Sequence, residues 1–220
     1  MARDPHFTPE LFRFLAALKR HNRRPWFLTN KERYERDVRQ PALRFIADFA
    51  PRLWALSPHF EAGPRSLFRI YRDIRFSHDK RPYKTHVGIH FSLSAGPQRV
   101  HTPGFYLHLE PESCFAAAGL WHPDSPTLRR VRDGMVREPG AWARVRRQIE
   151  PECRRLTRPP RGYPPGFRFL EDLKLKDFVA SVELTEREVC RPDFPRRFEK
   201  ACRQMLPLVE FLSRALGLRL

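Results

Sequence analysis

The sequence has few cysteines and no motif that would use them. Its four cysteines, Cys114, Cys153, Cys190 and Cys202, lie far apart and form no C-x-x-C pair. This spacing argues against a zinc knuckle, a thioredoxin-like redox site and a disulfide framework. The motifs G-x-x-x-x-G-K-[ST], G-x-S-x-G, H-E-x-x-H and G-x-G-x-x-G are absent as well. The sequence therefore carries no signature of a familiar catalytic class.

Long apolar runs are missing, which excludes a membrane-spanning helix. Such a span needs about 18 or more consecutive apolar residues, and no uncharged window of the sequence approaches that length. The N-terminus, M-A-R-D-P-H-F-T-P-E, also lacks the apolar core of a secretory signal peptide. We therefore expect a cytoplasmic protein without membrane contact, in which the cysteines stay reduced.

Lysine is scarce, whereas positive charge is plentiful. Of the 42 basic residues, 35 are arginine and 7 are lysine, and they outnumber the 25 acidic residues to give a net charge of +17. The preference for arginine is consistent with GC-rich coding, but the net charge does not depend on that preference. A field of this sign attracts nucleic acids, nucleotides and anionic metabolites. A basic surface without a specific partner is the alternative.

Apolar periodicity predicts helices at both ends and in the middle of the chain, with strands between them. Prolines suited to the first turn of a helix are Pro9, Pro126, Pro139 and Pro195. Alternating apolar and polar residues predict strands over residues 87–93, 105–109 and 178–184. The small, apolar run 114–120 predicts another strand, and a further strand is expected over 67–72. Short connections between the strands favour antiparallel pairing. We expect a single α+β domain over residues 1–220, with a mainly antiparallel sheet of about four to six strands packed by N-terminal, middle and C-terminal helices.

The stretch 69–86 holds the densest group of chemistry-bearing side chains. It has four arginines, two lysines, two histidines, two aspartates and two tyrosines. Asp73 lies between Arg72 and Arg75 and can accept a bidentate guanidinium pair, and Asp79 can do the same for a neighbouring cation. Arginines held in this way, with unpaired cations beside them, would form a rigid cradle for a phosphate or a carboxylate.

The same side chains support two further interpretations. They could form only a lattice of structural salt bridges that locks a long connection in place. Alternatively, arginines interleaved with aromatic residues such as Tyr71, Phe76 and Tyr83 could stack on single-stranded nucleic acid and neutralise it. The sequence leaves the three interpretations open.

A second group of polar residues lies on the predicted strands. Because the odd-numbered positions of the first two strands are apolar, the polar side chains between them should share the opposite face of the sheet. These are His86, His90, Tyr106, His108 and Glu110. They could bind a metal ion, supply a histidine general base, or form hydrogen bonds that are purely structural. The grouping depends on strand register, because a slip of one residue would disperse it.

Several motifs occur in an order that resembles one protein family. The central ones are R-x-x-R-D-x-R-F from Arg69 and D-K-x-x-Y from Asp79. Around them lie F-L-x-x-L and R-R-P-W-F near the N-terminus, G-F-Y-L-H-L-E-P at 104–111, A-G-L-W-H-P at 118–123 and R-G-Y-P at 161–164. Together they resemble the bacterial conserved hypothetical proteins of domain of unknown function 2461, except that Ala118 stands where a second glycine is expected. The resemblance implies a single-domain cytoplasmic protein and adds no substrate.

From these observations we predict a basic pocket that binds a phosphorylated or carboxylated small molecule, whether or not it also catalyses a reaction. The predicted ligand-binding residues are Arg69, Arg72, Asp73, Arg75, Asp79, Lys80, Lys84 and Tyr106. The predicted hydrogen-bonding and proton-transfer residues are Tyr83, His90 and His108. No residue is assigned as a metal ligand, and the sequence identifies no cofactor. The alternatives are a sequence-nonspecific nucleic-acid-binding module and a structural or partner-binding domain without a ligand.

Overall fold

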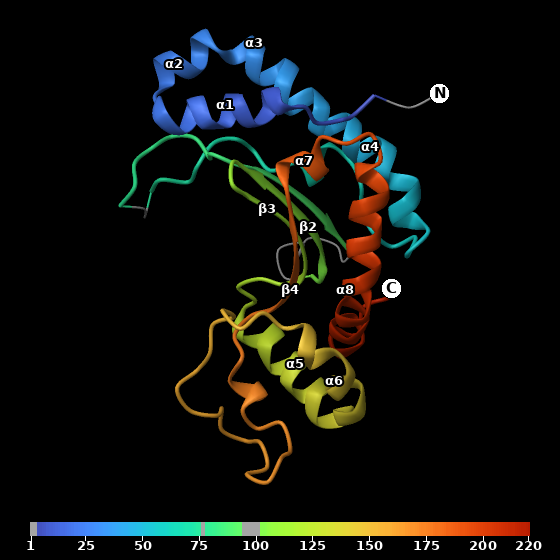
Figure 1. Cartoon of the computed structure of the whole chain (residues 1–220). Helices are drawn as coiled ribbons and strands as arrows, with labels where there is room; N and C mark the ends of the chain where they lie inside the picture. Colours follow the sequence, from blue (N-terminus) through green and yellow to red (C-terminus); the bar gives the residue numbers. More distant parts are fainter. Residues whose placement is uncertain (1–3, 76–77, 94–101) are drawn as a thin grey trace.

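The computed structural model describes residues 4–75, 78–93 and 102–220, and it shows an α+β fold (Figure 1). One antiparallel sheet has its strands in chain order, so that each strand pairs with the next. The strands are β1 (Val87–Ser92), β2 (Gly104–Glu110), β3 (Ser113–Leu120) and β4 (Phe178–Leu184). The predicted fold class is therefore confirmed.

Helices surround this sheet in three groups (Figure 1). The N-terminal group, at one end of the sheet, contains α1 (Pro9–Arg20), α2 (Arg24–Thr29), α3 (Lys31–Tyr34), a π-helical turn (Glu35–Arg39) and α4 (Gln40–Trp54). The middle group, at the other end, contains α5 (Ser125–Arg137) and α6 (Pro139–Val145). After β4 come α7 (Glu186–Val189) and the long α8 (Phe194–Leu216). No helix of the described chain is both long and apolar enough to cross a membrane.

The ends of these helices follow from local side-chain chemistry. The Asp124 side chain accepts a hydrogen bond from the Thr127 backbone N–H at 2.9 Å and so caps α5. Prolines occupy the first turns of α1, α5, α6 and α8, where a missing N–H costs nothing. Gly217 ends α8 in the left-handed conformation, with φ of 66°, which glycine adopts without steric cost.

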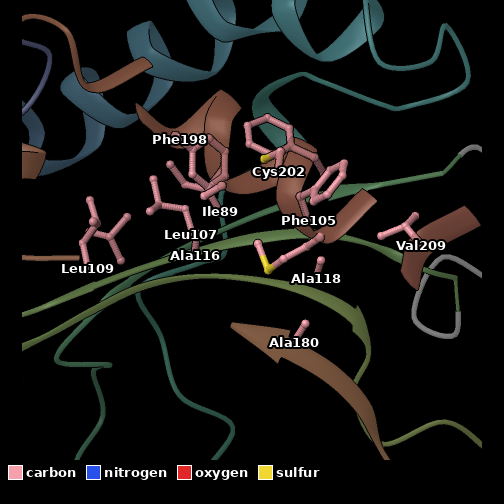
Figure 2. Close-up of a cluster of buried hydrophobic side chains, with 14 of the residues drawn as sticks. Ile89, Phe105, Leu107, Leu109, Ala116, Ala118, Ala180, Phe198, Cys202 and Val209 are labelled. Atoms are coloured by element: carbon pink, nitrogen blue, oxygen red, sulfur yellow. The ribbon is translucent and has the colours of Figure 1, made fainter. Parts of the chain in front are cut away.

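The core lies between one face of the sheet and α8 (Figure 2). Alternate strand residues, including Ile89, Phe105 and Leu107, point to this face and are fully buried. Phe198 and Cys202 of α8 pack against them and are equally buried. Burial of each large apolar side chain stabilises the fold by about 1.5–3 kcal/mol. Because one face is occupied in this way, the strand residues in between are directed to the other face.

The segment 67–72 is not a strand, contrary to the prediction. Among the described residues, its β-type pairing is limited to isolated bridges, Leu67 with Ile89 and Tyr71 with Tyr83. The Arg72 N–H donates to the Pro82 carbonyl at 2.9 Å. Proline has no N–H to donate in return, so a continuous ladder cannot form at that point. The segment instead runs along the outer edge of β1.

Candidate functional site

A pocket of about 660 Å³ lies over the face of the sheet that α8 leaves uncovered. Its floor is formed by residues of β1, β2 and β3, and the segment that precedes β1 forms one wall. The described lining residues are Glu61, Gly63, Arg65, Ser66, Phe68, His86, His90, Ser92, Thr102, Gly104, Tyr106, His108, Phe115, Ala117, Ala118, Gly119, Trp121 and Val179. Drug-sized ligands commonly occupy pockets of about 300–1,000 Å³.

The strand register places the predicted polar side chains together. His90 is directly opposite Tyr106, and His108 is opposite Gly88 on one side and Phe115 on the other. The His108 ring stacks on the Phe115 ring, with centroids 4.7 Å apart and an interplanar angle of 8°. The prediction that these polar residues share one sheet face is therefore confirmed. The observed strand register keeps them together, as the prediction required.

Three side chains of metal-ligand type converge at one end of the pocket. One ligand-type atom each from His86, His108 and Glu110 lies within 4.8 Å of the other two. The centres of the two imidazole rings are 4.5 Å apart. Nε2 of His108 is 3.4 Å from Oε2 of Glu110. This arrangement can share a proton or hold a cation.

Hydrogen bonds fix the orientation of this group. The Tyr106 hydroxyl lies 3.0 Å from Nδ1 of His108. The Thr85 hydroxyl donates to Oε1 of Glu110 at 2.7 Å. Each contact occupies the atom that faces away from the other members, so Nε2 of His108 and Oε2 of Glu110 are left facing each other.

Burial determines the protonation states in the pocket. It lowers the pKa of His86 to about 4 and that of His90 to about 4. Burial also lowers the pKa of His108, although the hydrogen bond to Glu110 acts in the opposite direction. For Glu110, burial alone would raise the pKa, but hydrogen bonds from Thr85 and His108 outweigh it and the pKa is lowered. At neutral pH the pocket therefore holds neutral imidazoles beside an ionised carboxylate.

Two glycines make room for these side chains. A Cβ on Gly88 would lie 2.7 Å from the Tyr106 hydroxyl oxygen, and one on Gly104 would lie 2.9 Å from Nε2 of His90. The same Gly104 Cβ would be 2.4 Å from the Phe91 carbonyl oxygen. Real Cβ contacts are not this short, so Gly104 requires a residue without a side chain, whereas a Cβ at Gly88 would displace the Tyr106 hydroxyl.

The motif residues that follow Arg69 form a separate, ion-paired loop. Asp79 binds Arg72 at 2.5 Å and Arg81 at 2.6 Å. Asp73 accepts two hydrogen bonds from the Arg75 guanidinium, the shorter at 2.7 Å. The Lys80 ammonium donates to the Ile74 carbonyl at 3.0 Å. None of these residues lines the pocket, and Phe76 of the motif lies outside the described residues.

The hydrogen bonds and charge of the neighbouring arginines also hold both carboxyls in their ionised form. The Arg75 side chain lowers the pKa of Asp73 to about 2. Arg81, followed by Arg72, lowers the pKa of Asp79 well below its usual range. Asp79 thus bridges two arginines, so each guanidinium has a carboxylate partner, while the single carboxylate balances only one of their two charges.

The remaining predicted residues are divided among three places. Tyr83 is 3% exposed and stacks on Phe27 at 4.2 Å, in the core and not in the pocket. Arg69 lines a second hollow of about 190 Å³, together with Lys31 and Arg39. Lys84 is half-buried, and its ammonium lies 5.2 Å from the centre of the Phe68 ring, which forms part of the pocket wall.

Sequence reasoning missed most of the described lining of the pocket, including three aromatic residues and an arginine. The aromatic rings of Phe68, Phe115 and Trp121 line it, and Trp121 is 67% exposed. Alternation along the third predicted strand would have placed Phe115 on the polar face, so a signal for this residue was present. Arg65 lies on the segment before β1, and nothing in its local sequence marks it.

Comparison with known proteins identifies a family. The family model described as conserved hypothetical protein DUF2461 matches residues 10–211, so the chain belongs to this family. No curated protein and no solved structure gives a significant match.

Proposed function

We propose that this member of the DUF2461 family binds a small organic molecule that carries a carboxylate or phosphate group, in the pocket over the open face of the sheet. The observation that carries the proposal is the pocket of about 660 Å³, floored by ordered strands and lined by aromatic and imidazole rings. A site built on strands holds its side chains more rigidly than a site built on loops.

The shape of the pocket favours a flat ligand. Its floor includes Gly104, Ala117 and Gly119, whose small side chains leave the sheet surface open. The rings of Phe68 and Trp121 lie on the lining, and both are substantially exposed. Aromatic surfaces of this kind stack against planar groups and bury much apolar area. We infer that a planar or ring-containing part of the ligand lies on the small-residue floor.

Charge at the wall favours an acidic group. Arg65 and Glu61 both line the pocket, and no ion pair between Arg65 and another described residue is formed. Lys84 lies next to Phe68 and also has no described carboxylate partner. An arginine that is not paired within the protein can bind a carboxylate or phosphate in bidentate fashion. Arg65 and Lys84, and not the ion-paired loop arginines, are the proposed anion-binding residues.

His90 is the proposed hydrogen-bonding or proton-accepting group of the pocket. Its ring lies beside that of Phe68, with centroids 6.2 Å apart, and its side chain has no hydrogen-bond partner among the described residues. Because burial keeps the imidazole neutral, one ring nitrogen can accept a proton or a hydrogen bond at neutral pH.

Binding of aromatic acids tests this proposal. Phenyl phosphate and benzoate are titrated into the protein by calorimetry, with phenol as the neutral control and inorganic phosphate as the control without a ring. We expect an acidic aromatic probe to bind more tightly than either control. Arg65→Ala should weaken that binding at least about tenfold, equivalent to about 1.4 kcal/mol. Ala117→Leu, which fills the floor, should weaken it by at least as much.

The motif loop supplies the matched control. Arg75→Ala removes an arginine that is already paired with Asp73 and should leave probe binding unchanged. Binding that is lost in Arg75→Ala and unaffected by Ala117→Leu would refute the pocket as the site. Failure of both acidic probes to bind at millimolar concentration would refute the ligand class.

A further inference from the structure

We propose that His86, His108 and Glu110 bind one divalent transition-metal ion at the end of the pocket. One candidate ligand atom from each residue lies within 4.8 Å of the other two. Two imidazole nitrogens and a carboxylate oxygen form a donor set that suits Zn²⁺ and Fe²⁺. The inference concerns the metal alone and does not depend on the organic ligand proposed above.

The spacing of the candidate donor atoms fits a metal site. Zinc lies about 2.0–2.2 Å from nitrogen and oxygen ligands, and a tetrahedral arrangement then places neighbouring donors about 3.4 Å apart. Nε2 of His108 and Oε2 of Glu110 are separated by 3.4 Å. The His86 ring lies beside His108, with centroids 4.5 Å apart. Because the candidate donor atoms lie within 4.8 Å of one another, the His86 nitrogen has to come nearer by at most about 1.4 Å to complete the set.

The neighbouring hydrogen bonds are those that a metal site requires. A ligating histidine usually donates its other ring N–H to an oxygen, which fixes its orientation. Nδ1 of His108 lies 3.0 Å from the Tyr106 hydroxyl, which can accept that N–H. The Glu110 carboxylate is oriented in turn by the Thr85 hydroxyl, 2.7 Å from Oε1. Nε2 and Oε2 are thereby left to face the ion.

A change of tautomer in His108 allows the same hydrogen-bond partners to serve both the metal-free and the metal-bound site. Without metal, Nε2–H donates to Glu110 and the Tyr106 hydroxyl donates to Nδ1. With metal, the proton resides on Nδ1 and is donated to the Tyr106 oxygen, so the Nε2 lone pair is free for the ion. The His108 imidazole stays neutral in both states: Nε2 gives its proton to solvent, Nδ1 takes one up, and the Tyr106 hydroxyl rotates to accept it.

Three protein ligands leave a coordination position unfilled. His86 and His108 both line the pocket, so that position opens onto it. A site with three protein ligands and an open position is typical of catalytic zinc, whereas structural zinc has four protein ligands. The class of reaction that such a site supports is attack by metal-bound water or polarisation of a carbonyl or phosphoryl oxygen.

Titration of chelator-treated, metal-free protein with Zn²⁺ tests the inference. Calorimetry should show one equivalent bound, and Co²⁺ should give a visible absorption spectrum with the intensity of a four- or five-coordinate site. His108→Ala and Glu110→Gln should each weaken Zn²⁺ binding at least about 100-fold. Tyr106→Phe keeps the ring and removes only the hydroxyl, so it should fold normally and weaken binding about 10- to 100-fold.

Two control variants exclude adventitious binding. His78 lies exposed in the motif loop, and Cys190 is the least buried cysteine. His78→Ala and Cys190→Ser should leave the Zn²⁺ affinity unchanged. Stoichiometric binding that survives Tyr106→Phe and Glu110→Gln, or that is lost in either control, would overturn the proposal. So would the absence of Zn²⁺ binding at about 100 μM. Failure of the aromatic acids to bind would leave this result unaffected.

Discussion

The hydroxyl of Tyr106 lies 3.0 Å from Nδ1 of His108, on the same sheet face and two residues along the same strand. This contact explains why the opposite nitrogen of His108 faces Glu110. It also links the strand alternation that is visible in the sequence to the chemistry of the pocket. Whatever displaces the Tyr106 hydroxyl should therefore affect the site before it affects the fold.

Substitutions of two glycines in the sheet should separate an effect on the site from an effect on the stability of the fold. Gly104→Ala places a methyl group against the Phe91 carbonyl, which is backbone and cannot move without a shift of the strand. We expect it to lower the free energy of unfolding by about 1–3 kcal/mol in urea titrations. Gly88→Ala meets mainly the movable Tyr106 hydroxyl, so it should destabilise less but weaken Zn²⁺ binding. Gly140→Ala, which meets no atom within 4 Å, is the control. Equal effects at all three positions would contradict the geometry.

The motif loop should affect stability more than binding. Asp79→Asn removes the carboxylate charge that bridges Arg72 and Arg81, and we expect a lower melting temperature in calorimetric scans. Zn²⁺ affinity and aromatic-acid affinity should remain as in the wild type, because the loop does not line the pocket. A variant that melts normally but no longer binds either probe would show that the loop belongs to the site.

A buried carboxylate that does not itself line the pocket, Asp177, predicts part of the acid sensitivity. Asp177 is fully buried, and it accepts hydrogen bonds from the Arg154 guanidinium at 2.6 Å and the His122 N–H at 2.8 Å. Burial alone would raise the pKa of Asp177, but these hydrogen bonds and the charge of Arg154 lower it. Ionised Asp177 therefore stabilises the fold fully above the pKa of an unfolded-state aspartate, about 3.9. This stabilisation is lost as the pH falls through the lower pKa that Asp177 has in the folded protein.

The corresponding measurement compares Asp177→Asn with the wild type in urea at several pH values. We expect Asp177→Asn to lower the free energy of unfolding by about 1–3 kcal/mol at neutral pH, since a charged acceptor is replaced while its donors remain. The difference should narrow as the pH is lowered below about 4. Asp4→Asn, at an exposed position, should show no such pattern. A difference in free energy of unfolding that grows as the pH falls would contradict a lowered pKa for Asp177.

Nucleic acid should bind only through the general positive charge. With a net charge of +17 we expect retention on single-stranded DNA at about 50 mM salt, falling steeply as salt is raised. Ala117→Leu should not change this retention, because the pocket takes no part. Salt-resistant binding that is lost in Ala117→Leu, measured by fluorescence anisotropy, would instead make the pocket a nucleic-acid site.

The sheet and its polar face could be predicted because strand alternation is a local property. The apolar residues Ile89, Phe105 and Leu107 show which face is buried, and His90 and Tyr106 must then point the other way. For the same reason the histidine-bearing part of the predicted site was accessible from the sequence. Alternation does not choose among registers that differ by two residues, and in the observed one His90 is opposite Tyr106.

The positions of Tyr83 and of the motif loop could not be predicted, because they depend on contacts between residues that are distant in the chain. Tyr83 is buried because Asn22, 61 residues earlier, holds its backbone by two hydrogen bonds and Phe27 stacks on its ring. Arg72 pairs with Asp79 and not with the adjacent Asp73, because the chain returns beside Arg72, whose N–H donates to the Pro82 carbonyl. No local pattern distinguishes such a cation from one that remains unpaired, so the arginine loop and the pocket could not be separated from the sequence.

Anomalous diffraction from crystals of the metal-free protein soaked in Zn²⁺ tests most directly whether the open sheet face is the functional site. The account predicts one strong peak about 2.0–2.2 Å from donor atoms of His86, His108 and Glu110. A map without a peak there, in which His108 and Glu110 keep their direct contact of 3.4 Å, would contradict it.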